Sequence, residues 1–107
     1  MTSQQSIAPS QCANMEAIRN EIDAIDRQVI RLLARRFDYV KAAAPFKKNP
    51  DEVQARERFT SMLAQRRDWA TDYGLDAEMI EKLYRDLVGW FIAQEMAHWS
   101  GQNAERA

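Results

Sequence analysis

Four ionisable side chains occupy positions where the sequence predicts apolar helix faces. In the first half of the chain, apolar residues recur at alternating steps of three and four, which is the pattern of one helical seam. The same steps lead to Arg36 and then to Lys47. Arg56 falls on the line of Val53, and Glu95 falls on an apolar face near the C-terminus. Because buried cations without partners are costly, three cations and one acid on inward lines indicate a site for an anionic ligand.

The spacing of the basic residues limits how one ligand could contact them. On a straight helix Arg36 and Lys47 are roughly 16 Å apart with nearly the same direction, so both could hold one small molecule. Arg19 is roughly 25 Å before Arg36, too far for a ligand of about ten heavy atoms to touch both in one chain. An antiparallel first helix from a second protomer would bring its Arg19 to that site. We therefore expect a two-fold dimer, with a solvent-exposed Arg19 as the simpler alternative.

A purely structural interpretation stays open for these residues. Arg36 could extend to the edge of the seam, and Glu95 could neutralise it as an internal ion pair. A non-catalytic helical dimerisation module would have the same apolar seams. His98 has no cysteine or histidine partner at ligand spacing, and Cys12 has no nearby histidine. We therefore expect no metal site, no cofactor and no cysteine nucleophile.

The elements that must position these residues are helices. No segment alternates with period two, so the predicted fold class is all-α, with one long and two medium helices. The long helix begins near Asn14. The second begins after Asn49, a good N-cap, and ends near Gly74, a residue suited to a left-handed cap. The third begins after Asp76 and ends near Trp99.

The size and charge of the chain limit its partners. A length of 107 residues predicts one domain, over residues 14–99, with a mobile N-terminal arm at 1–13 and a frayed tail at 100–107. Fifteen basic and sixteen acidic residues leave no broad positive field, so nucleic acid and membrane surfaces are not expected partners. No apolar run is long enough to span a bilayer or to resemble a signal peptide. These features predict a soluble cytoplasmic homo-oligomer.

Three stretches together resemble a known family. They are "IRNEIDAIDRQVIRLLARRFDYVKAAAPFK", "RER" at the start of the second helix, and "GLDAEMIEKLYRDLVGWFIAQEMAHW". They are similar to the all-helical chorismate mutase family, most closely to the isochorismate-pyruvate lyases of salicylate and siderophore biosynthesis. The resemblance covers about Met15 to Trp99. It implies an intertwined helical homodimer, in which Arg19 of one protomer completes the site of the other.

The resemblance also implies a reaction and the residues that carry it. Isochorismate would be converted to salicylate and pyruvate, and chorismate secondarily to prephenate, by a concerted pericyclic mechanism without acid, base or covalent intermediate. A dedicated chorismate mutase of aromatic amino-acid biosynthesis is the near alternative. Lys47, Glu95 and Arg36 would be catalytic. The substrate-binding set adds Arg19, Arg56, Val40, Met62 and Ile92.

Three features of this sequence differ from the family pattern. Glutamine is usual where this chain has Glu95, and a glutamate must be protonated to donate a hydrogen bond there. Pro45 predicts that the first helix ends or kinks just before Lys47. The Arg56–Glu57 pair is typical of the mutases, whereas the surrounding sequence follows the lyases.

Overall fold

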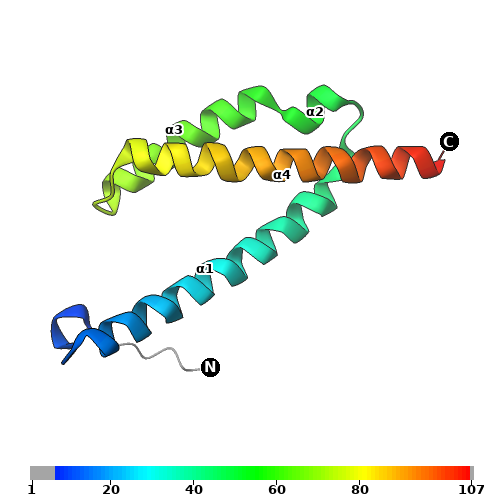
Figure 1. Cartoon of the computed structure of the whole chain (residues 1–107). Coiled ribbons are helices and arrows are strands. Elements are labelled where there is room, and N and C mark those ends of the chain that lie inside the picture. The colour runs from blue at the N-terminus through cyan, green and yellow to red at the C-terminus, as the bar shows by residue number, and fades with distance from the viewer. Residues whose placement is uncertain (1–6, 107) are drawn as a thin grey trace. The chain divides into compact units, whose positions relative to one another are not determined.

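The computed structural model describes the backbone of residues 7–106 and the side chains of residues 7–101. Within this range the regular structure is entirely helical, which confirms the all-α prediction. Figure 1 shows the elements, which are η1 (Pro9–Gln11), α1 (Met15–Ala43), η2 (Ala44–Phe46), α2 (Pro50–Gln54), α3 (Arg56–Asp72) and α4 (Ala77–Arg106). The chain divides into two compact units, Met1–Arg36 and Phe37–Ala107.

The described part of the first unit is mainly the N-terminal part of α1. Asn14 caps the helix, because its Oδ1 accepts the backbone N–H of Ala17 at 2.9 Å. The predicted apolar seam is present along α1 but is open to solvent. Val29 and Leu32 are 47% and 51% exposed, and no residue of α1 is buried.

The second unit contains the core, between α3 and α4. These helices lie side by side in Figure 1, joined by a short turn. Gly74 in that turn has a φ of 76°, as its predicted left-handed role requires. Asp76 caps α4 by accepting the backbone N–H of Met79 at 2.8 Å. The core cluster is Met62, Leu63 and Val88, with Phe59, Tyr84 and Ile92 packed against it.

The prediction of one uninterrupted second helix is wrong. Asn49 caps α2 as expected, accepting the backbone N–H of Glu52 at 2.9 Å. Ala55 then adopts a left-handed conformation with φ 44° and ψ 58°, so α2 ends and α3 begins. An alanine in this conformation costs roughly 1–2 kcal/mol. The break also takes Arg56 off the buried line of Val53, and Arg56 is exposed.

The end of α1 agrees with the sequence prediction, whereas the end of α4 does not. Helix α1 ends at Ala43, and Pro45 lies in η2, so the prediction of a break before Lys47 is confirmed. Lys47 is in extended backbone, and therefore the helical distance from Arg36 does not apply. Helix α4 has 30 residues, against 29 in α1, so it is long where a medium helix was expected. Its backbone stays helical beyond Trp99 to Arg106, through most of the segment predicted to fray.

The predicted arm and tail are described only in part. Residues 7–13 contain η1, whereas residues 1–6 of the arm lie outside the described range, as does residue 107 of the tail. The division into an arm, a domain over 14–99 and a tail therefore stays a prediction.

Candidate active site

A lysine and a buried glutamate meet in the second unit. Glu95 on α4 is only 6% exposed, and its Oε2 lies 3.6 Å from Nζ of Lys47. The same ammonium donates a hydrogen bond to the backbone carbonyl of Glu52 at 3.0 Å. Glu95 Oε2 accepts no hydrogen bond from any residue that the structure describes. The pair therefore combines a cation with a buried carboxyl oxygen that has unused capacity for a proton or a donor.

The segment that carries Lys47 is held on two sides. The indole N–H of Trp99, on α4, donates to the carbonyl of Lys47 at 2.9 Å. The carboxylate of Glu52, on α2, accepts the backbone N–H of Lys48 at 2.8 Å. Glu52 is itself fixed by its N-cap bond to Asn49. Helices α2 and α4 thus both position the loop between η2 and α2.

Arg56 shares an open pocket with Lys47. The pocket has a volume of about 480 Å³ and is lined by Lys47, Glu52, Ala55, Arg56, Glu57 and Arg58. The Nε of Arg56 donates to the side chain of Gln54 at 3.2 Å. Three cations against two carboxylates leave this pocket with a positive excess, which suits an anionic ligand.

The predicted apolar wall residues all lie in the second unit. Met62 belongs to the core cluster, and Ile92 packs against it. Ile92 is one helical turn before Glu95 on α4, so apolar and ionisable side chains follow each other along one face. Val40 is partly buried near the end of α1.

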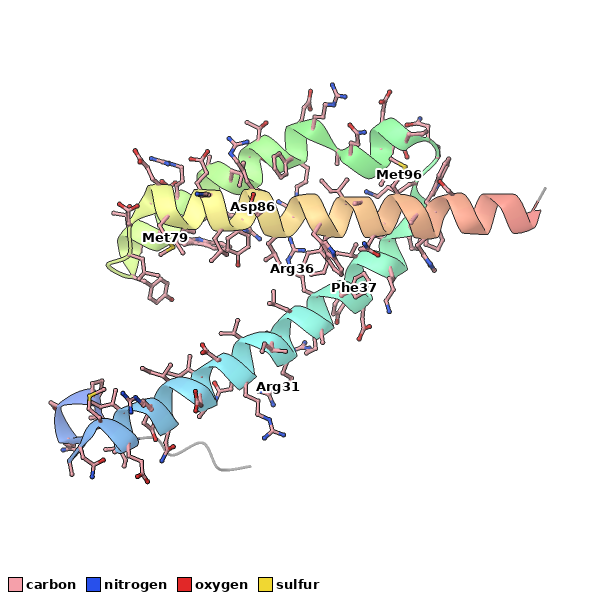
Figure 2. All side chains as sticks on the ribbon, viewed as in Figure 1. Arg31, Arg36, Phe37, Met79, Asp86 and Met96 are labelled. Atoms are coloured by element: carbon pink, nitrogen blue, oxygen red, sulfur yellow. The ribbon has the colours of Figure 1, made fainter. Side chains whose placement is uncertain are left out.

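The two remaining site residues lie in the first unit, on α1. Arg19 is exposed and Arg36 is partly buried, and Figure 2 shows Arg36 near the C-terminal part of that helix. The structure therefore places Lys47 in contact with Glu95 and in one pocket with Arg56, while Arg19 and Arg36 belong to the other unit.

The described residues contain no group of three or more histidine, cysteine, aspartate or glutamate side chains placed to hold a metal ion. Across the same stretch of chain, every helix is too short or too polar to cross a bilayer.

Comparisons with known proteins identify the family. A family model described as chorismate mutase type II matches residues 18–96. The chain belongs to this family. Isochorismate pyruvate lyase of Pseudomonas aeruginosa is 41% identical over 91 residues, which are 85% of this chain and 90% of that protein. The resemblance inferred from the sequence is thereby confirmed.

Longer proteins are similar to this chain over a segment of their length. T-proteins of Haemophilus influenzae and Enterobacter agglomerans are 35% and 34% identical over 82 and 77 residues, respectively. These matches cover 76% and 71% of this chain, but only 22% and 21% of the T-proteins. The similar segment is therefore about a fifth of those chains and about three-quarters of this one.

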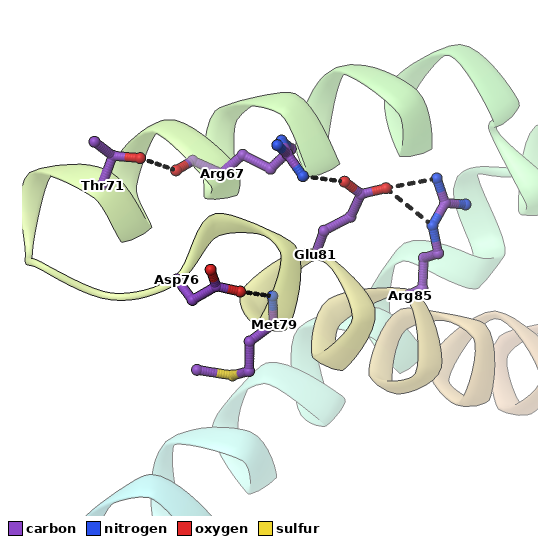
Figure 3. A network of polar contacts seen from close by, with 6 residues as sticks. All are labelled: Arg67, Thr71, Asp76, Met79, Glu81 and Arg85. Carbon is purple, nitrogen blue, oxygen red and sulfur yellow. Dashed lines mark hydrogen bonds and ion pairs between the residues drawn. The ribbon is translucent and has the colours of Figure 1, made fainter.

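An ion-pair network, separate from Lys47, ties the two core helices of this chorismate mutase domain together. Glu81 on α4 accepts hydrogen bonds from Arg85 at 2.8 Å and from Arg67 on α3 at 2.7 Å, as Figure 3 shows. The guanidinium of Arg85, and then that of Arg67, lowers the pKa of Glu81 below its ordinary value of 4.5. The network joins α3 to α4 and so supports the framework of the site.

Sequence reasoning missed the residues that support Lys47. Trp99 was predicted only as an apolar residue near the end of a helix, and Glu52 only as an acid in a first turn. The Glu52 contact had a local signal, because a first-turn acid often caps the preceding segment. The Trp99 contact joins residues 52 positions apart and had none.

Proposed function

We propose that this enzyme cleaves isochorismate to salicylate and pyruvate and, as a secondary activity, rearranges chorismate to prephenate. The observation that carries the proposal is the 41% identity to an isochorismate pyruvate lyase over nine-tenths of that protein's length. The family match spans both Lys47 and Glu95. Their contact gives the proposed chemistry a cation and a buried carboxyl group at one place.

The proposed reaction needs positioning and charge stabilisation more than acid–base groups. As the ether C–O bond breaks, one ring hydrogen must pass to the enolpyruvyl methylene, because salicylate is aromatic and pyruvate has a methyl group. Both changes occur in one cyclic shift of electrons. Holding the enolpyruvyl arm over the ring contributes through proximity. Lys47 would donate to the ether oxygen as negative charge grows on it.

Glu95 would be the second polar contact at the ether oxygen. An ionised carboxylate only accepts hydrogen bonds and would repel that oxygen, whereas a protonated one donates. The carboxyl is buried beside Lys47, and its Oε2 accepts no hydrogen bond from a described residue. We propose for Glu95 the donor role of the glutamine that is usual in the family, a role that only the acid form of a carboxyl group can fill.

The remaining residues would bind and enclose the substrate. Arg36 would hold a substrate carboxylate with paired N–H donors, which suit a planar anion. Arg56 shares the pocket of Lys47 and would attract the second carboxylate. The apolar wall would consist of Val40, Met62 and Ile92.

The site would be completed in a homodimer. Helix α1 has an apolar seam without any buried residue, and an exposed apolar stripe of this length needs a cover. A second α1 packed antiparallel would cover it and bring Arg19 of that protomer to the site of Arg36 and Lys47. The exposed position of Arg19 leaves it available for this contact.

A dedicated chorismate mutase is the second candidate. The description of the matching family and the two T-protein matches favour it. The Arg56–Glu57 pair, which resembles the mutases, also supports it. The two candidates share one site and differ in the preferred substrate.

A binding experiment separates both enzymes from a non-catalytic dimerisation module. A chorismate-like cyclic dicarboxylate should raise Tm, since a ligand at a hundred times its Kd stabilises the native state by about 2.7 kcal/mol. The dimethyl ester of the same compound is the control, because it keeps the shape and lacks the charges. Equal Tm values with acid, ester and buffer would contradict an anion site.

A further inference from the structure

Both ends of Lys47 contact the same face of α4. The backbone carbonyl accepts the indole N–H of Trp99 at 2.9 Å, and the ammonium lies 3.6 Å from Glu95. Residues four positions apart on a helix are neighbours on one face. Two residues one turn apart on α4 therefore contact Lys47. Trp99 holds its backbone, and Glu95 lies next to its side chain.

The indole bond meets a local need of the backbone. Lys47 follows η2 in an extended conformation with φ −89° and ψ 138°, and its N–H is bonded to the carbonyl of Ala44 at 3.1 Å. Its carbonyl lies beyond the end of η2, and the indole N–H supplies the donor. In the same turn Ala44 is fully buried and η2 packs on α4, whereas the adjacent Phe46 is 82% exposed. The position of Lys47 therefore depends on polar contacts in addition to the packing of Ala44.

We propose that Trp99 is a positioning residue, which sets where the Lys47 ammonium stands at the reacting ether oxygen. The inference rests on the proposed function, in which Lys47 is the donor to that oxygen. Trp99 acts through the backbone of residue 47 and does not touch the substrate. It lies three residues beyond the segment 18–96 that the family model matches. A misplacement of about 1 Å can cost roughly a hundredfold in rate, so a backbone anchor of this kind affects turnover.

The first test removes only the indole N–H. Trp99→Phe keeps an aromatic ring, and we expect kcat to fall roughly tenfold with little change in KM, because the carboxylate contacts remain. Trp90→Phe is the matched control on the same helix. Trp90 packs against Phe37 and Phe91 instead of the Lys47 loop, and we expect its kcat to match the parent. An unchanged kcat in Trp99→Phe would overturn the proposal.

A double-mutant cycle distinguishes positioning from general support of the fold. If Trp99 acts through Lys47, Trp99→Phe should reduce kcat no further in a Lys47→Ala background. A reduction of the same factor in both backgrounds would show that Trp99 acts independently of Lys47, and would overturn the assignment.

Limited proteolysis tests the anchor without any turnover. Trypsin cleaves after Lys48, and we expect faster cleavage there in Trp99→Phe than in the parent or in Trp90→Phe, measured by mass spectrometry of the fragments. Equal cleavage rates would overturn the anchor even if the enzyme is fully active. A parent protein that turns over neither substrate but shows this difference would contradict only the proposed function.

Discussion

Lys47 and Glu95 come from separate elements, yet Nζ and Oε2 lie 3.6 Å apart at a position where the glutamate is almost fully buried. The lysine is in the loop after η2, and the glutamate is on α4. A buried ion pair is weak evidence for stability, because desolvation offsets much of the Coulomb attraction. Lys47 also lines an open pocket with an excess of positive charge, and we propose that the pair acts on an anionic substrate there.

Replacing Lys47 should affect turnover more than binding. Removing one preorganised donor to a developing oxyanion typically lowers kcat by about 10²–10³-fold, so we expect a loss of this size in Lys47→Ala with a smaller change in KM. Lys48→Ala is the control, because its backbone N–H contacts Glu52. Steady-state kinetics with isochorismate would measure both. Near-normal turnover in Lys47→Ala would remove Lys47 from the site.

The role of Glu95 should be visible in the kcat of two variants. Glu95→Gln keeps an N–H donor of similar shape and should retain much of the parental kcat. Glu95→Ala has no donor at this position and should lose about 10²–10³-fold in kcat, because charge on the ether oxygen loses a hydrogen bond. Steady-state kinetics would measure both variants. If they lose kcat to the same extent, Glu95 is a structural partner of Lys47 alone.

The shared site can be tested by mixing inactive chains. If Arg19 of one protomer serves the pocket of Lys47 in the other, a dimer of Arg19→Ala and Lys47→Ala chains has one intact pocket of two. Mixing these variants should therefore restore up to about a quarter of parental activity, since half of the dimers at random exchange are mixed. The measurement needs a label that verifies subunit exchange. Verified exchange without recovery would rule out the cross-protomer role of Arg19.

The Glu81 network predicts a pH-dependent contribution to stability. The pKa of Glu81 is lowered in the folded protein by Arg85 and then Arg67, so its contribution is present above the unfolded value near 4.5 and is lost as the pH falls through the folded value. Glu81→Gln should therefore lower Tm slightly at pH 7, and this difference should disappear in acid. The effect is small because the pair is solvent-screened.

The control for this measurement is Asp86→Asn. Asp86 is an exposed acid on the same helix and is labelled in Figure 2. Thermal unfolding of the three proteins between pH 3 and 7 provides the comparison. A Tm difference for Glu81→Gln that stays constant across this range would show that the carboxylate charge has no part in it.

Local signals in the sequence predicted where α1, α2 and α4 begin and where α1 and α3 end. Asn14, Asn49 and Asp76 are N-caps whose side chains accept backbone N–H groups within the next few residues. Pro45 follows the end of α1 because proline has no backbone N–H, and Gly74 follows the end of α3 because glycine readily adopts a positive φ. Each of these effects acts over a few residues, so a single sequence contains the necessary information.

The less predictable features depend on distant contacts. Alanine favours helix, so Ala55 gave no sign of the left-handed break that separates α2 from α3. The break lies beside Val53, which is 1% exposed, and α2 packs on α4. Packing of this kind can override local propensity, and as a result Arg56 was wrongly placed on an inward line. The burial of Glu95 could be predicted, because the neighbouring positions on its helix face are apolar.

Product analysis with the two substrates supplied separately tests the central claim most directly. The purified protein should convert isochorismate to equal amounts of salicylate and pyruvate, and should convert chorismate to prephenate more slowly. Chromatography of both reactions over time gives kcat/KM for each. A higher kcat/KM for chorismate, without salicylate from isochorismate, would identify a dedicated chorismate mutase. Absence of any product from either substrate, in protein shown to be folded, would contradict the enzymatic account altogether.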